Sequence, residues 1–180
     1  TPLSVTGPIF DEGGIYTFKI NLDAQDEVGI ISDVEFEVQV SVTNVKYYQE
    51  KVGEKDAEFR VKSYYDKVSN FEYDSKENVA KISFPFDFSE TNISHTNVIH
   101  TEIMFAKNTL EFLSPNYSGT GNGIELFKSS IFIDDYSEED NRIVHFVLLP
   151  DHVRHIKNQM KKMGEEMPNS IDLVLNKGKE

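Results

Sequence analysis

The chain has 180 residues, a net charge of −13 and no cysteine. The charge argues against nucleic acids and anionic membrane surfaces as partners, because both would repel an acidic protein. The absence of cysteine excludes disulfides, thiolate nucleophiles, cysteine-ligated zinc and blue-copper centres. Thirteen Phe and eight Tyr supply enough apolar area for a packed globular core.

Near the N-terminus, two stretches alternate apolar and polar residues with the period of two that is typical of β-strands. They span residues 16–22 and 34–42, and residues 23–32 connect them with a turn at Gly29. The pair predicts an antiparallel hairpin with one face on the core.

Similar alternation predicts strands around residues 59–61 and 71–73 and over residues 80–86. Pro85 cannot donate a hydrogen bond to a ladder, so the third strand should lie at a sheet edge or end near this residue. Residues 115–123 are rich in Gly and Ser, which indicates a mobile surface loop.

Two later strands carry histidine. Residues 98–105 present two different faces, with Ile99, Ile103 and Phe105 on one and His100, Glu102 and Met104 on the other. Residues 143–149 form an apolar run broken only by His145, which predicts a central, buried strand.

The C-terminal region departs from the β pattern. Four apolar residues recur at helical spacing and predict a helix over about residues 151–163: Val153, Ile156, Met160 and Met163. Asp151 is the expected N-cap and Gly164 the expected end of this helix. Residues 171–175 alternate again and predict a closing strand.

Together these elements predict a mainly β protein. We expect an antiparallel β-sandwich of eight to ten strands, immunoglobulin-like or of an enlarged jelly-roll type, with one α-helix in the C-terminal region. Because an immunoglobulin module takes about 100 residues, the chain is either one enlarged sandwich or two small abutting ones. We expect residues 1–180 to form a single enlarged sandwich, because the stretch before the polar turn at residues 74–78 is too short to close a separate core.

The histidines offer two candidate metal sites. His152 and His155 are three residues apart on the predicted helix, a spacing that lets two imidazoles reach one ion, and His145 precedes them. His100 and Glu102 share a strand face and offer nitrogen and oxygen ligands. Without cysteine, such a site would hold zinc or type 2 copper. The competing interpretation is a solvent-facing helical pair and a polar strand face.

The densest acidic run, residues 134–140, is a third candidate site. Its carboxylates could supply the hard oxygen ligands that calcium prefers: Asp134, Asp135, Glu138 and Asp140. The run lacks the EF-hand spacing, so the competing interpretation is a solvated hairpin tip.

Five segments share a pattern with known surface proteins: residues 7–18, 84–88, 100–102, 122–126 and 134–137. In the first of them, Gly14, Tyr16 and Phe18 match a Gly-x-Tyr-x-Phe strand of sandwich domains. On these segments the chain resembles exported, cell-surface β-sandwich proteins of ammonia-oxidising archaea. The resemblance implies export, an extracellular location, tethering to a membrane through segments outside this sequence, and no catalytic residue.

We therefore expect a noncatalytic extracytoplasmic binding or structural domain, not an enzyme, whose partners are other surface proteins or envelope components. The first alternative is a protein that binds a divalent metal, copper or zinc, through histidines. The second is an envelope hydrolase with paired carboxylates, for which Asp87, Glu90 and Glu102 are among many candidates. The sequence contains no established hydrolase, nucleotide-binding or metalloprotease motif, which favours the noncatalytic function.

Overall fold

The computed structural model describes residues 12–25, 31–74, 76–109 and 117–177, which form three antiparallel sheets. The first sheet is a hairpin of β1 (Gly14–Gln25) and β2 (Ile31–Val42). The second has the order β10-β11-β7-β4-β3, and its strands are β3 (Asn44–Val52), β4 (Lys55–Ser63), β7 (Ile99–Ala106), β10 (Ile131–Asp134) and β11 (Asn141–Leu148). The third has the order β5-β6-β12-β8-β9, and its strands are β5 (Asn70–Asp74), β6 (Val79–Pro85), β8 (Tyr117–Gly121), β9 (Ile124–Glu125) and β12 (Ser170–Lys177). The helices are α1 (Glu90–His95), the single 3-10 turn η2 (Lys128–Ser130) and α2 (Pro150–Met163).

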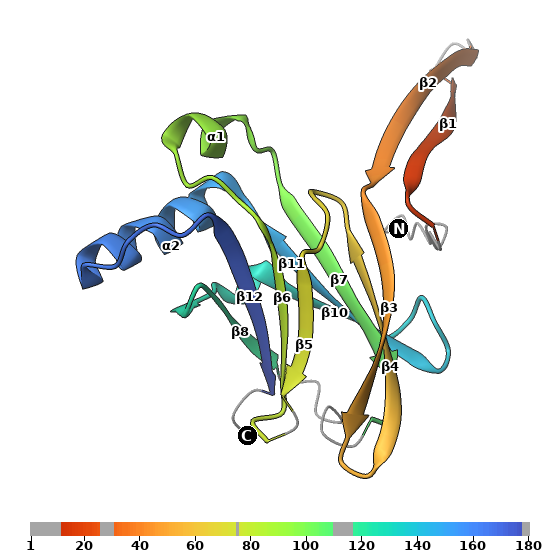
Figure 1. The fold of residues 1–180 in the computed structure, drawn as a ribbon. Helices are drawn as coiled ribbons and strands as arrows, with labels where there is room; N and C mark the ends of the chain where they lie inside the picture. Colours follow the sequence, from red (N-terminus) through yellow and green to blue (C-terminus); the bar gives the residue numbers. More distant parts are fainter. Residues whose placement is uncertain (1–11, 26–30, 75, 110–116, 178–180) are drawn as a thin grey trace.

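The two five-stranded sheets face each other (Figure 1), and one hydrophobic cluster fills the space between them. Phe59 and Val61 enter it from β4, while Ile82 and Phe84 enter it from β6. The prediction of a mainly β, antiparallel sandwich with a helix in the C-terminal region is therefore confirmed. The described residues form twelve strands rather than eight to ten, partly because the edge strand β3 is mostly exposed or half-buried and has no apolar stripe.

The glycine-rich segment that we predicted as a mobile loop is largely the strand β8, which pairs with β12. Its glycines allow close packing. A Cβ atom on Gly119 would lie 2.8 Å from the carbonyl oxygen of Val174, and one on Gly121 would lie 2.6 Å from the Ile156 side chain. The prediction was wrong here because glycine serves two purposes, flexible turns and close contacts, and only the fold shows which applies.

The predicted helix is confirmed as α2, which buries Val153, Ile156 and Met160. It ends at Gly164, whose φ of 77° is in the left-handed region that favours glycine. The predicted N-cap is wrong. Leu149 occupies that position without a side-chain hydrogen bond, because Pro150 begins the helix with a preset φ. Among the described residues, no helix combines the length and apolarity needed to cross a membrane.

The hairpin of β1 and β2 extends away from the sandwich (Figure 1). Its register is regular, yet Ile20 and Val38 on its apolar face are 37% and 41% exposed. Beyond their mutual pairing, β1 and β2 make few contacts with the other described elements. The expectation that this hairpin packs one face on the core is therefore wrong. Only Thr43 separates β2 from β3, so the hairpin continues the edge strand of the second sheet.

Candidate metal centre

The site is built on the strand β7, whose residues alternate between the two faces of the second sheet. Ile99, Ile103 and Phe105 are buried in the core cluster, as the sequence predicts. The intervening residues His100 and Glu102 therefore point to the opposite face of the sheet. This face carries the candidate site.

Strand pairing places residues of β11 and β4, the two neighbours of β7, beside this site. Glu102 is paired with His145 of β11 on one side and with Lys62 of β4 on the other. The backbone N–H of Tyr64 donates to the carbonyl oxygen of His100 at 2.9 Å, which brings Tyr64, the first residue after β4, beside the imidazole. Residues far apart in sequence thus meet across three adjacent strands.

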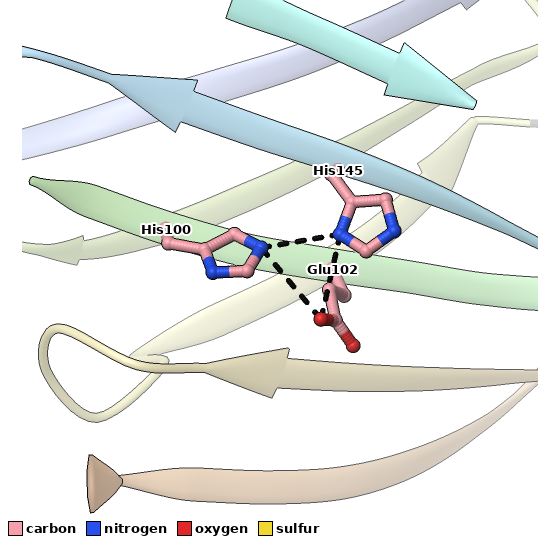
Figure 2. Close-up of side chains that lie close together, drawn as sticks. All are labelled: His100, Glu102 and His145. Carbon is pink, nitrogen blue, oxygen red and sulfur yellow. Dashed lines mark hydrogen bonds and ion pairs between the residues drawn. The ribbon is translucent and has the colours of Figure 1, made fainter. Parts of the chain in front are cut away.

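Three side chains converge at one point on this face (Figure 2): His100, Glu102 and His145, hereafter the His–Glu cluster. His100 Nε2 lies 3.1 Å from His145 Nδ1. Glu102 Oε1 lies 3.6 Å from His100 Nε2 and 3.4 Å from His145 Nδ1. Among the described residues, this is the only group of three His, Asp or Glu side chains whose ligand atoms lie this close together.

The spacing of these three atoms fits a small metal ion. Zinc ligands lie about 2.0–2.1 Å from the ion, so two ligands of a tetrahedral site lie about 3.3–3.4 Å from each other. The separations of 3.1, 3.4 and 3.6 Å between the three atoms bracket that value. An ion at the centre of this triangle would reach all three atoms with little movement of the side chains.

Two further side chains surround the carboxylate of Glu102. The Tyr64 hydroxyl donates to Glu102 Oε1 at 2.8 Å, and its ring stacks on His100 with centroids 4.4 Å apart. The ammonium of Lys62 lies 3.8 Å from Glu102 Oε2. Lys62 and Glu102 are only 3% and 7% exposed, so both charges are shielded from water.

The surrounding residues shift the pKa values of His100, Glu102 and Tyr64. Burial lowers the pKa of His100, against the opposing effect of the Glu102 charge. Burial disfavours the ionised form of Glu102, but the hydrogen bonds and charges of His145, Tyr64 and Lys62 outweigh it and lower the pKa of this carboxyl. Burial and the adjacent carboxylate raise the pKa of Tyr64, so its hydroxyl remains a donor. A neutral imidazole and an ionised carboxylate are the forms that bind metals.

The structure places the two histidines of the predicted helix elsewhere. His152 Nδ1 lies 2.8 Å from the hydroxyl oxygen of Ser130, and the ring contacts Phe127. The ring of His155 also contacts Phe127, with centroids 4.7 Å apart. The structure therefore groups His145 with His100 and Glu102, and it leaves the two helical imidazoles around Phe127.

The acidic residues predicted as a calcium site bind protein donors. Asp134 accepts hydrogen bonds from Ser137 and from the backbone of Tyr136, and Asp135 binds Arg142 through both carboxylate oxygens. Glu138 accepts from Arg60 at 2.7 Å and from Asn141 at 2.8 Å.

A lysine also donates hydrogen bonds to the backbone of this acidic segment. Lys107 Nζ donates to the carbonyl oxygens of Asp135, Glu138 and Glu139 at 2.8–2.9 Å, and the carbonyl oxygen of Asp140 accepts from the Lys107 backbone N–H. A lysine ammonium thus lies among the carbonyl oxygens that a calcium ion would need.

The sequence did not indicate Lys62 or Tyr64 as site residues. The only available signal was the alternation along β4 and into the next residue, which places both opposite the buried Phe59 and Val61. That pattern predicts the face of the sheet on which a residue lies, but not which residues of other strands lie beside it.

Comparisons with protein-family models, with curated proteins and with solved structures find no match to this chain. The described residues and their geometry are therefore the basis for inferring a function.

Proposed function

We propose that this chain is a metal-binding protein whose His–Glu cluster holds one divalent transition-metal ion. The observation that supports the proposal is the triangle of His100 Nε2, His145 Nδ1 and Glu102 Oε1, with sides of 3.1, 3.4 and 3.6 Å. Two imidazoles and one carboxylate are the ligand set of several catalytic zinc sites, in which a water molecule takes a further position.

The ligand types favour transition-metal ions such as zinc or copper over calcium and magnesium. Imidazole nitrogen suits Zn²⁺ and Cu²⁺, whereas Ca²⁺ and Mg²⁺ prefer a full set of oxygen ligands. The two ring nitrogens lie 3.1 Å apart and can share only one proton between them. A metal ion that replaces this proton would bind both nitrogens at once.

Zinc titration of the purified chain tests the proposal. We expect one Zn²⁺ per chain, measured by calorimetry and by elemental analysis after dialysis. We also expect zinc to raise the melting temperature, because a ligand at 100 times its Kd stabilises the folded state by about 2.7 kcal/mol. A chain that retains no zinc or copper and shows no thermal shift would contradict the proposal, and the cluster would then be a purely hydrogen-bonded network.

A noncatalytic role as an extracytoplasmic domain of a cell-surface protein is the second candidate, and the projecting hairpin favours it. Its apolar face exposes Ile20 and Val38, the type of surface that binds other proteins of an envelope. The test is cosedimentation with cell envelopes of the source organism. Replacing Ile20 and Val38 with Lys should abolish it, whereas replacing Asn21 and Gln39 on the polar face with Lys should not. Equal cosedimentation of both variants would count against this candidate.

A further inference from the structure

Glu102 has one oxygen that faces the two histidines and one that does not. Oε1 is the atom of the triangle, and it also accepts the hydrogen bond of the Tyr64 hydroxyl at 2.8 Å. Oε2 faces the ammonium of Lys62 at 3.8 Å. The two oxygens of this carboxylate are therefore in different environments, which are set by Lys62 of β4 and by Tyr64 directly after this strand.

Tyr64 contacts two members of the His–Glu cluster at the same time. Its hydroxyl holds Glu102, and its ring lies nearly parallel to that of His100, at an angle of 11° with centroids 4.4 Å apart. A single side chain thus restricts the rotation of one carboxylate ligand and one imidazole ligand. Outer partners of this kind orient the residues that bind the metal.

We infer that Tyr64, together with Lys62, makes Glu102 a ligand through Oε1 alone, and that this restriction selects four-coordinate ions over calcium. The inference rests on the proposed function and extends it to the choice of metal. Tyr64 holds Oε1 in place while Lys62 attracts Oε2 away from the centre, and together they disfavour the binding through both oxygens that is common with Ca²⁺. Tyr64 is a positioning residue in this arrangement, not a ligand.

The variant Tyr64→Phe tests the inference because it keeps the stacked ring and removes only the hydroxyl. We expect the affinity for Zn²⁺ to fall about 10–100-fold, the usual effect of losing an outer partner. In the Co²⁺-loaded protein we expect the strong visible absorption of a four-coordinate ion to weaken, because a freed carboxylate can bind through both oxygens. Tyr136→Phe, at a residue that is 94% exposed, is the matched control and should change neither quantity.

A second measurement uses only the wild-type chain, so it does not depend on whether the variant folds. X-ray absorption of the zinc-loaded protein should show four nitrogen or oxygen ligands at about 2.0–2.2 Å and no longer distance from a second carboxylate oxygen. A bidentate carboxylate, or a Tyr64→Phe variant with wild-type affinity and an unchanged Co²⁺ spectrum, would overturn the inference and leave the proposed metal site intact. A wild-type chain that binds no metal would overturn both.

Discussion

Replacing His145 with alanine is expected to lower the affinity of the chain for Zn²⁺ by at least about 100-fold, because losing a ligand costs more than losing an outer partner, which costs about 10–100-fold. The remaining pair, His100 and Glu102, comes from one strand and leaves the β11 side of the triangle open. At a zinc concentration that stabilises the wild type by about 2.7 kcal/mol, a 100-fold weaker variant gains only about 0.4 kcal/mol. Calorimetric titration and thermal melts with and without zinc measure both quantities.

The controls for this result are His152→Ala and His155→Ala. Each removes an imidazole from α2 that contacts Phe127 rather than the His–Glu cluster. Both variants should bind zinc as the wild type does. If His152→Ala weakened zinc binding as much as His145→Ala, the helical set suggested by the sequence would be the true site and the His–Glu cluster would not.

Replacing Phe59 with alanine is expected to destabilise the folded chain by about 3–5 kcal/mol, a large share of the 5–15 kcal/mol that is typical of a whole domain. Phe59 is fully buried between the two sheets, and its ring lies 5.4 Å from those of Phe71 and Tyr73 and 6.0 Å from that of Phe105. Alanine would remove these contacts and leave a cavity. Denaturant unfolding, with an unchanged slope and a lower midpoint, measures the loss.

Phe132→Ala is the matched control, because this side chain is 50% exposed on β10. We expect a loss of less than about 1 kcal/mol, as is usual for surface substitutions. Comparable losses in the two variants would mean that the cluster around Phe59 is not the main source of stability.

The sequence predicted the faces of β7 and β11 but not the site that they form. Alternation correctly separated His100 and Glu102 from the buried residues, and it marked His145 as a polar position in an apolar strand. His100 and His145 are 45 positions apart, and their contact depends on the register between two strands. Register is a property of the whole sheet, so local patterns grouped His145 with its sequence neighbours on α2 instead.

The errors in the fold have related causes. A period of two indicates that a strand has an apolar face, but not whether another element covers it, and the face of the β1–β2 hairpin is exposed at Ile20 and Val38. The glycines of β8 indicated a loop, because glycine has no side chain and therefore cannot show the apolar alternation of a strand. In both cases the decisive information is tertiary packing, which one sequence does not contain.

The junction between β2 and β3 determines how the molecule would respond to a mechanical load. A pull on the hairpin, opposed at the end of the sandwich near Val52, would pass through Thr43 into β3 and act along the axis of that strand. The nine register pairs between Asn44–Val52 and β4 would then be loaded in shear, because antiparallel hydrogen bonds lie perpendicular to the strands. Bonds loaded in this direction share the force instead of opening one after another. A chain anchored through its hairpin would therefore resist extension at the strand next to β4, which carries Lys62 and leads directly to Tyr64.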